Sequence, residues 1–166
     1  MSEVLLRPAR TGDVAAIRRL VDLYAPDRRL LSKATVTLFE DVQEFVVAEV
    51  DGVPVGCGAL HVMWQDLAEI RTLAVDPDCV GQGIGGRLLA LLIDRGRALG
   101  VSRIFCLTFE NSFFSRHGFE ELSEPAVPPD VFAELLRSED EGVAEFLDLE
   151  RVKPNTLGNT RMIMRL

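Results

Sequence analysis

The sequence predicts a mixed α/β fold, with a central and mostly antiparallel sheet flanked by helices. Three observations predict it. Two apolar runs flank an Asp51-Gly52 pair, which is the usual signal of an antiparallel hairpin. An apolar run at residues 67–75 is followed by a glycine-rich loop, a helical pattern and another apolar run, as in a β-loop-α-β unit. A chain of 166 residues with 48% hydrophobic residues has the size and core of one domain, here residues 1–166.

The N-terminal half of the chain predicts two helices on the sheet. Residues 11–24 carry apolar side chains at helical spacing, and a shorter helical pattern covers residues 34–44. The remaining apolar runs alternate or stay continuous over strand lengths. They place strands at residues 3–9, 44–50, 53–63 and 67–75.

The C-terminal half predicts a long helix and further strands. Residues 83–99 form the helix after the glycine loop, with Gly100 as its C-cap. The run after it is almost entirely apolar, which predicts a strand buried on both faces. Strands are expected at residues 102–109, 119–122 and 159–166, and shorter helices at residues 111–118 and 128–137.

The segment "DPDCVGQGIGGRLL" (residues 76–89) holds four glycines just before the long helix. Glycine at this density costs backbone entropy, so a ligand-free turn is a weak explanation. Successive N–H groups and the helix dipole suit phosphate instead. The loop also matches the dinucleotide pattern G-x-G-x-x-G, but "DPDCV" separates it from its strand and antiparallel hairpins precede it, which argues against a Rossmann fold.

The longer segment "LAVDPDCVGQGIGGRLL" resembles the central motif of the GCN5-related N-acetyltransferase (GNAT) family. Gly83 and Gly85 match its two defining small residues, whereas Val80 stands where the family usually has Arg or Gln. The resemblance covers about residues 3–122, with the family's order of elements. It implies the GNAT acyl-CoA N-acyltransferase fold, with acetyl-CoA as cosubstrate. The implied pyrophosphate cradle consists of Gly81, Gln82, Gly83, Ile84, Gly85 and Gly86.

Acetyl transfer to an amine requires a neutral amine, a stabilised carbonyl oxygen and aligned reactants. The resemblance implies that the strand "AEIRTLAV" pairs with the pantetheine arm through Ala74 and Val75, and that the Leu73 amide polarises the thioester carbonyl. Glu69 matches the position of the general base in several members, and an edge-facing salt-bridge partner is the alternative. Arg71 faces the same way as Glu69, so it either grips a substrate carboxylate or pairs with Glu69.

The acid that would protonate the leaving thiolate is missing from its usual place. Many relatives have a tyrosine where this chain has Phe114. Because the thiolate of coenzyme A is a good leaving group, a dedicated acid is not required. His61 and His117 are each isolated in the sequence, which favours structural roles.

Other segments resemble more narrowly the short, single-domain form of the bacterial N-acetylglutamate synthases. They are "EIRTLAVDP", "LTFENSFFSRHGFEEL", "LLSKATVTLFEDVQEFVVAE" and "GVAEFLDLERVKPNTLGNTRMIMRL". This resemblance implies acetylation of the α-amino group of L-glutamate, the first step of arginine biosynthesis. It implies Lys33, Arg71 and Arg161 as residues that bind the substrate carboxylates. Glutamine, a polyamine, a protein N-terminus and a non-catalytic acetyl-CoA sensor are the alternatives.

The composition of the chain limits the classes of partner and ligand that we expect. The net charge of −8 argues against broad nucleic-acid binding. The three cysteines have no CxxC spacing, so we expect neither a disulfide framework nor a metal site. No apolar run is long enough to span a bilayer and none resembles a signal peptide, which predicts a cytoplasmic protein without membrane association. A homodimer is compatible with the resemblance, because this fold often pairs through its sheet ends.

Overall fold

The structure is a computed structural model that describes residues 2–25, 34–123, 127–156 and 158–166. Its described strands form one seven-stranded sheet with the order β1-β2-β3-β4-β5-β7-β6. The chain divides into two compact units. Unit 1 comprises Met1–His61 and Ile70–Leu99, and unit 2 comprises Val62–Glu69 and Gly100–Leu166. Strands β3 (Val53–Trp64) and β4 (Leu67–Val75) contribute residues to both units, and the single domain expected from the sequence stays a prediction.

The antiparallel part of the sheet in unit 1 confirms the hairpin prediction. β1 (Val4–Pro8) pairs with β2 (Phe45–Val50), and β2 pairs with β3, both antiparallel. At the turn between β2 and β3, the φ angles of Asp51 and Gly52 are 50° and 78°. Positive φ at both central residues matches the twist of the flanking strands, which is why the Asp-Gly signal specifies this hairpin.

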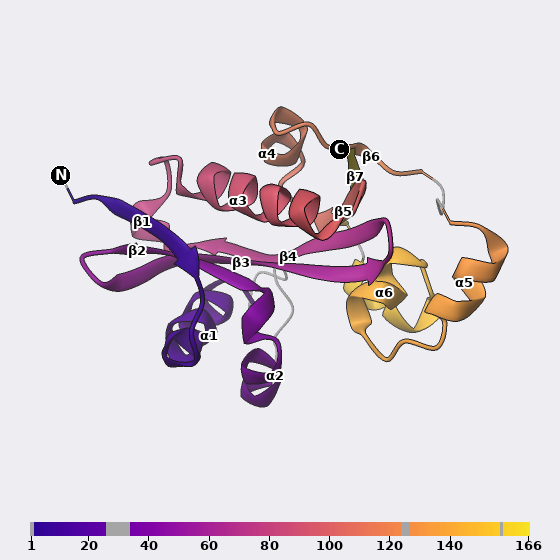
Figure 1. Cartoon of the computed structure of the whole chain (residues 1–166), viewed down its shortest axis with the longest axis horizontal. Helices are drawn as coiled ribbons and strands as arrows, with labels where there is room; N and C mark the ends of the chain where they lie inside the picture. The colour runs from indigo at the N-terminus through magenta and orange to yellow at the C-terminus, as the bar shows by residue number, and fades with distance from the viewer. Residues whose placement is uncertain (1, 26–33, 124–126, 157) are drawn as a thin grey trace. The chain divides into compact units, whose positions relative to one another are not determined.

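The helices of unit 1 cover both faces of its sheet (Figure 1). α1 (Val14–Tyr24) and α2 (Thr35–Glu40) lie on one face, and α3 (Ile84–Leu99) lies on the other. Short 3₁₀ turns precede or follow them: η1 (Thr11–Asp13), η3 (Val42–Glu44) and η4 (Pro77–Cys79). These elements match the positions that the sequence predicts.

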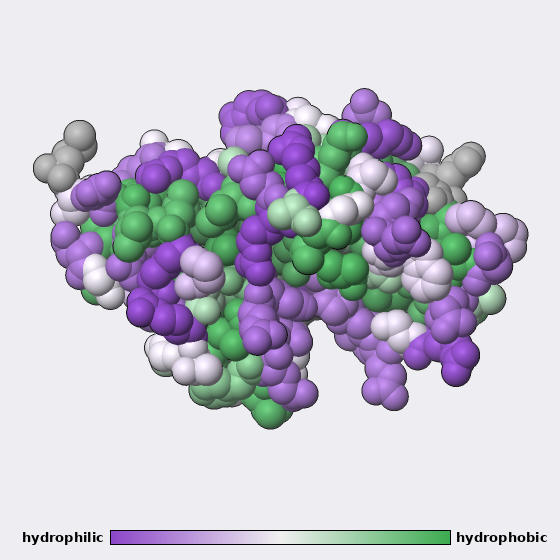
Figure 2. Space-filling view, in the orientation of Figure 1, coloured by the Kyte–Doolittle hydropathy of each residue, from purple (hydrophilic) through white to green (hydrophobic). Residues whose placement is uncertain are grey.

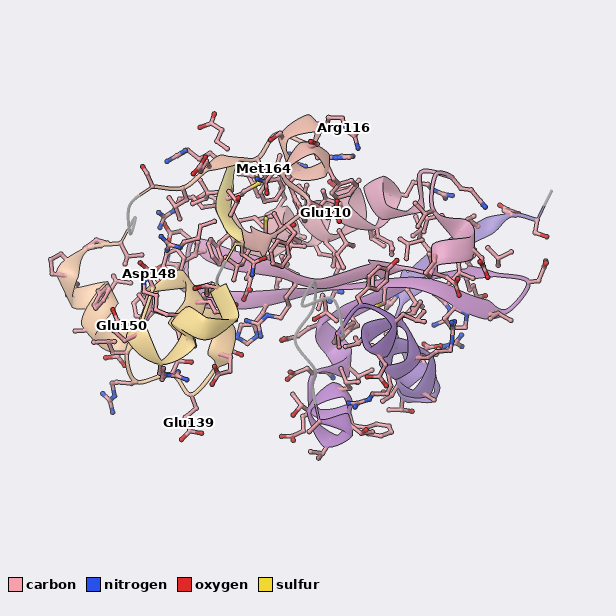
Figure 3. All side chains as sticks on the ribbon, turned by 180° about the vertical axis from the view of Figure 1, so that it is seen from behind. Glu110, Arg116, Glu139, Asp148, Glu150 and Met164 are labelled. Atoms are coloured by element: carbon pink, nitrogen blue, oxygen red, sulfur yellow. The ribbon has the colours of Figure 1, made fainter. Side chains whose placement is uncertain are left out.

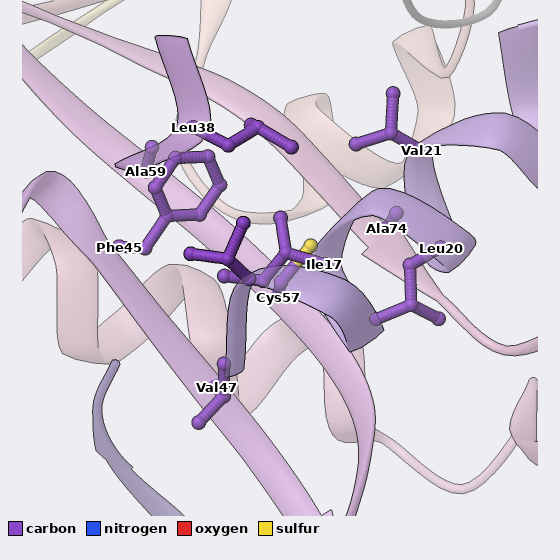
Figure 4. Packing of buried hydrophobic residues seen from close by; sticks show 10 residues of the cluster. Ile17, Leu20, Val21, Leu38, Phe45, Val47, Cys57, Ala59 and Ala74 are labelled. Atoms are coloured by element: carbon purple, nitrogen blue, oxygen red, sulfur yellow. The ribbon is translucent and has the colours of Figure 1, made fainter. Parts of the chain in front are cut away.

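The apolar stripe of α1 forms the core on the first face of unit 1. Figure 4 shows it packed against side chains from β2, β3 and β4, with Leu38 of α2 beside it. Figure 2 shows that the outer side of α2 is also hydrophobic, and Val36 there is 61% exposed. The buried cluster consists of Val14, Ile17, Leu20, Val21, Leu38, Phe45, Val47, Cys57, Ala59 and Ala74.

Two glycines of β3 let α3 lie close to the other face. A Cβ at Gly56 would stand 2.9 Å from Leu88 Cδ1, and one at Gly58 would stand 2.8 Å from Leu92 Cδ1. Leu88 and Leu92 are fully buried on α3. A larger residue at either position would therefore force the leucine side chains of α3 to shift.

Unit 2 is built around β5 (Arg103–Thr108), which pairs parallel with β4 and antiparallel with β7 (Thr160–Arg165). The parallel pairing confirms the β-loop-α-β prediction. β6 (Glu120–Glu121) pairs with β7 at the sheet edge. The helices of this unit are α4 (Asn111–Arg116), α5 (Pro129–Leu135), α6 (Glu141–Phe146) and α7 (Lys153–Thr156), with the 3₁₀ turn η5 (Glu150–Val152).

Helix α6 is absent from the elements that the sequence predicts. It has six residues and contains Gly142, so local propensity gives little support for a helix. Asp140 caps it by accepting a hydrogen bond of 3.0 Å from the Val143 amide. Phe146 is fully buried and meets Phe105 edge-on, with ring centroids 5.2 Å apart. Tertiary packing therefore stabilises α6 where propensity does not.

Among the described residues, no helix is long and apolar enough to cross a membrane.

Candidate active site

The glycine loop of unit 1 has the backbone that an anion cradle requires. The φ angles of Gly81 and Gly83 are 89° and 77°, in the left-handed region that favours glycine. A Cβ at either position would meet no atom within 4 Å, so the space beside the loop is open. α3 begins directly afterwards at Ile84, which is 2% exposed. The first N–H groups of a helix have no partner within the helix, so Ile84, Gly85 and Gly86 can supply donors to a phosphate.

Strand β4, which leads into this loop, is not a regular strand. Thr72 has a φ of 58° and is buried. A β-branched residue in this region is strained by about 1–3 kcal/mol, and such strain is often found at functional sites. The Cys57 thiol donates to the Thr72 carbonyl across 3.5 Å, and burial raises the pKa of this thiol to about 12, so it remains a donor. The irregular backbone lies one residue before Leu73, the residue whose amide we expect to act on the thioester.

The pairing of β4 with β5 stops early. The parallel register joins Leu67–Glu69 to Arg103–Phe105 and ends there, although both strands continue. The backbone groups of Leu73, Ala74 and Val75 therefore lie beyond this ladder. This is the part of β4 that the sequence assigns to the pantetheine arm.

Glu69 is a buried carboxylate in unit 2, with 4% of its surface exposed. It is in register with Phe105, so the two side chains share one face of the sheet. Burial raises the pKa of the Cys106 thiol well above its usual value, and the charge of Glu69 adds to this effect. The carboxylate thus lies within electrostatic reach of β5.

Arg161 on β7 lies on the same face of the unit 2 sheet. It is in register with Leu107, two residues along β5 from Phe105, and its Cζ atom is 5.7 Å from the centre of the Phe105 ring. An Nη2 group donates to the Phe146 carbonyl at the end of α6. Burial lowers the pKa of Arg161, with an opposing contribution from Asp148.

The guanidinium of Arg161 does not use all of its hydrogen-bond donors. Its Nε atom is buried and has no hydrogen-bond partner among the described residues. The nearby Asp148, which follows α6 (Figure 3), instead pairs with Lys153 at 2.5 Å. A buried donor without a partner costs about 1–3 kcal/mol. Sequence reasoning could name Arg161 but could not show that its Nε donor has no partner among the described residues.

One face of unit 2 therefore carries Glu69 on β4, Phe105 on β5 and Arg161 on β7. Neighbouring strands lie about 4.8 Å apart, so the backbones of β4 and β7 are separated by roughly 10 Å. A proton acceptor and a cation thus lie on one face of unit 2, and these are the two kinds of group that binding and deprotonation of an amino acid require.

The end of β5 holds a polar cluster that sequence reasoning missed in part. The Asn111 side chain donates to Thr160 Oγ1 at 2.8 Å, and the Glu110 amide donates to Thr108 Oγ1 at 2.7 Å. Thr108 and Thr160 are register partners, so this cluster ties the start of α4 to the start of β7. The only sequence signal for it is the polar pair Glu110 and Asn111 directly after an apolar run.

Three further residues are singled out in the sequence: Lys33, Arg71 and Phe114. Lys33 lies outside the described residues. Arg71 is half-buried on the unit 1 part of β4. Phe114 is 6% exposed and packs edge-on against Phe119. This aromatic packing explains why the position needs no hydroxyl for folding.

Both histidines make contacts that fit the structural roles expected of them. His61 lies 2.8 Å from the Glu44 carboxylate. The ring of His117 stacks on Phe113 with centroids 4.6 Å apart, and its Nδ1 donates to the Phe113 carbonyl at 2.7 Å. Among the described residues, no cluster of three or more His, Cys, Asp or Glu side chains could hold a metal ion.

The chain belongs to the GNAT acetyltransferases: the model of the acetyltransferase (GNAT) family matches residues 15–122. It is 56% identical over 165 residues to an amino-acid acetyltransferase of Mycobacterium tuberculosis, covering 98% of this chain and 94% of that protein. The structure of Rv2747 from the same organism, in complex with CoA and NLQ, superimposes with a TM-score of 0.95 at 56% identity over 98% of this chain and 99% of that one.

A third comparison extends the likeness to a longer protein. N-acetylglutamate synthase from Neisseria gonorrhoeae, complexed with coenzyme A and N-acetyl-glutamate, matches with a TM-score of 0.81 and 30% identity. The match covers 100% of this chain and 36% of that one. These comparisons confirm the GNAT fold and acetyl-CoA as the cosubstrate of an N-acetyltransferase.

Proposed function

We propose that this protein transfers the acetyl group of acetyl-CoA to the α-amino group of L-glutamate. The observation that carries the proposal is Arg161, a half-buried cation with an unsatisfied donor, on the same face as the buried carboxylate of Glu69. The relatives support it, since one is named an amino-acid acetyltransferase and another is complexed with N-acetyl-glutamate. The product would enter arginine biosynthesis as its first intermediate.

The cosubstrate is held by backbone groups in this proposal. The N–H groups of the glycine loop, from Gly81 to Gly86, bind the pyrophosphate. Ala74 and Val75 hold the pantetheine arm beyond the β4–β5 ladder. Val80, which replaces the family's usual Arg or Gln, is 66% exposed and adds no charge. Phosphate binding thus depends on amides and on the dipole of α3.

Glu69 acts as the general base. An amino acid carries its α-amine mainly as an ammonium ion at neutral pH, so a proton must leave before the amine can attack. A carboxylate that is 4% exposed can accept this proton directly or through one water molecule. The Leu73 amide then polarises the thioester carbonyl, and coenzyme A leaves as a thiolate.

Arg161 binds a carboxylate of the substrate. A guanidinium can donate two parallel hydrogen bonds to a carboxylate, which fixes its orientation as well as its position. Arg71 and Lys33 complete the recognition of a dicarboxylic amino acid. A polyamine fits this arrangement poorly, because its cationic groups would be repelled by Arg161.

Glutamine is the second candidate, and it differs from glutamate only in the group at the end of its side chain. The half-buried Arg161 can bind the α-carboxylate that both amino acids share. Arg71 or Lys33 would then discriminate between the two amino acids, because a cation binds a carboxylate more strongly than it binds a neutral amide.

A panel of amines tests the proposal. Purified protein with acetyl-CoA should release coenzyme A, detected with DTNB, when glutamate is added. Spermidine should give no release above background. Release with spermidine and none with any amino acid would refute the proposal, and coenzyme A binding without turnover for any amine would favour a sensor. Glu69→Gln serves as the control for enzyme-dependent release.

We also expect a cytoplasmic enzyme that forms a homodimer. Light scattering on the purified chain measures its mass directly, and a monomer at working concentrations would contradict this part of the proposal.

A further inference from the structure

Two side chains of α1 hold the backbone at the point where β4 ends and the phosphate loop begins. The Tyr24 hydroxyl donates to the Val75 carbonyl. Arg19 Nη1 pairs with Asp76 Oδ2 at 3.0 Å. Val75 and Asp76 are consecutive, so α1 contacts the strand and the loop on either side of one peptide bond. Tyr24 is the only tyrosine of the chain, and its hydroxyl thus has a defined partner.

Asp76, which binds Arg19, also forms hydrogen bonds with the residues that begin the loop. Its Oδ1 accepts from the Asp78 amide at 3.0 Å, and its carbonyl accepts from the Cys79 amide at 2.8 Å. Its own amide donates to the Val55 carbonyl of β3 at 2.7 Å. The hydrogen bond from the Asp78 amide, together with the contact from Arg19, holds the pKa of Asp76 below its usual value.

Arg19 also reaches the neighbouring strand. Its Nη2 donates to the Pro54 carbonyl at 3.2 Å, while its Nη1 binds Asp76. One guanidinium therefore joins α1, the start of β3 and the end of β4. This fork geometry is rigid, so it fixes the direction in which the chain leaves the sheet.

The loop after η4 depends on such anchors, because it is not packed into the core. Residues 80–83 are all exposed. The next buried residue is Ile84, whose side chain begins the apolar stripe of α3. The contacts from α1 fix one end of the loop and Ile84 fixes the other, while the glycines between them contribute no side chains.

We propose that Tyr24 and Arg19 are positioning residues for the acetyl-CoA cradle, acting through Val75 and Asp76 rather than by touching the cofactor. This inference rests on the assignment of Val75 and of the glycine loop as the cofactor site. A loop held in its binding conformation before the ligand arrives loses less conformational freedom on binding. Loss of either anchor therefore weakens acetyl-CoA binding and leaves the chemical step intact.

The test uses the full-length protein with Tyr24→Phe and Arg19→Gln, measured by calorimetric titration with coenzyme A and by steady-state kinetics. We expect the Kd for coenzyme A and the KM for acetyl-CoA to rise about three- to tenfold in each variant, because Tyr24→Phe removes one hydrogen bond and Arg19→Gln removes two partly exposed contacts. The kcat at saturating acetyl-CoA and the KM for the amino acid should stay within about twofold of wild type.

Arg18→Gln is the matched control. Arg18 is the neighbour of Arg19 on α1, and it pairs with Asp22 of the same helix at 3.2 Å. The substitution costs the same helix propensity and the same charge, and it leaves the pair between Arg19 and Asp76 in place. Its Kd for coenzyme A should equal that of wild type, and a rise equal to that of Arg19→Gln would overturn the inference.

Other outcomes separate the inference from the assignments beneath it. If Tyr24→Phe and Arg19→Gln lower the Tm but bind coenzyme A like wild type, the two residues are only structural and the inference is wrong. Gly83→Ala tests the cradle itself, and unchanged coenzyme A binding in that variant would remove the basis of the inference. Because titration needs no amine, failure of glutamate as substrate would leave this test intact.

Discussion

Glu69 is the residue whose chemistry decides whether this chain is a catalyst. Burying a carboxylate to this extent costs free energy of folding unless the group is paired. Buried ionisable groups are therefore often found at functional sites. Its position on β4, opposite Phe105, is fixed by the strand register. The sequence could place Glu69 on a strand, but its depth of burial depends on β5 and on the helices packed over that face.

Replacing Glu69 with Gln removes the proton acceptor and nearly preserves the shape. We expect kcat at neutral pH to fall about 10²-fold or more, with acetyl-CoA binding unchanged. Steady-state kinetics across pH provides the measurement. If the variant keeps the wild-type pH–rate profile, Glu69 is not the base.

Arg161→Gln removes the cation proposed to bind the substrate. We expect the KM for glutamate to rise at least tenfold, equivalent to about 1.4 kcal/mol, with little change in the KM for acetyl-CoA. Arg165→Gln on the same strand is the control, because Arg165 is exposed and pairs only loosely with Glu120 at 3.9 Å. Equal effects of the two substitutions on the KM for glutamate would contradict a specific role for Arg161.

At the scale of elements, strand and helix positions in unit 1 follow closely from sequence patterns. The Asp51-Gly52 turn and the glycine loop are local signals with one dominant structural solution. The left-handed Thr72 is different, because a β-branched residue gives no local hint of positive φ and the conformation is imposed by the surrounding sheet. The position of α6 likewise depends on Phe105, far away in the sequence.

The start of α1 is held by an ion pair that the sequence also did not reveal. Arg7 of β1 binds both carboxylate oxygens of Asp13, at 2.7 and 2.8 Å, and also bonds Glu49 of β2. The Asp13 carboxylate accepts from the Arg10 amide as well. The hydrogen bond from Arg7 is the main reason why the pKa of Asp13 lies below its usual value.

Asp13→Asn should therefore destabilise the protein by about 2–3 kcal/mol at neutral pH, since it leaves Arg7 only partly paired in a mostly buried site. Asp22→Asn, in an exposed pair with Arg18, should cost less than about 0.5 kcal/mol. Urea unfolding measures both. Similar losses for the two variants would contradict the account of the α1 terminus.

The contribution of Asp13 to the free energy of unfolding depends on pH in a defined direction. The pKa of Asp13 is lower in the folded protein than its ordinary value of 3.8, so the stabilising contribution of this carboxylate is full above that value. It is lost as the pH falls through the lowered folded pKa. The stability difference between wild type and Asp13→Asn should thus shrink in acid, below about pH 4, and a difference that stays constant there would exclude this linkage.

At the scale of the whole molecule, an acidic chain presents local sites for anions. The net charge of −8 favours cationic partners at long range. The proposed sites oppose this tendency locally, with the amides of the glycine loop in unit 1 and the guanidinium of Arg161 in unit 2. The net charge alone is compatible with a polyamine as substrate. The placement of Arg161 favours an amino acid instead.

The most direct measurement is product analysis by mass spectrometry after incubation of the protein with acetyl-CoA and an equimolar mixture of glutamate, glutamine and spermidine. We expect N-acetylglutamate as the main product, with its formation strongly reduced in Glu69→Gln. Acetylated spermidine as the main product, or no acetylated amino acid while coenzyme A binds, would contradict the central claim.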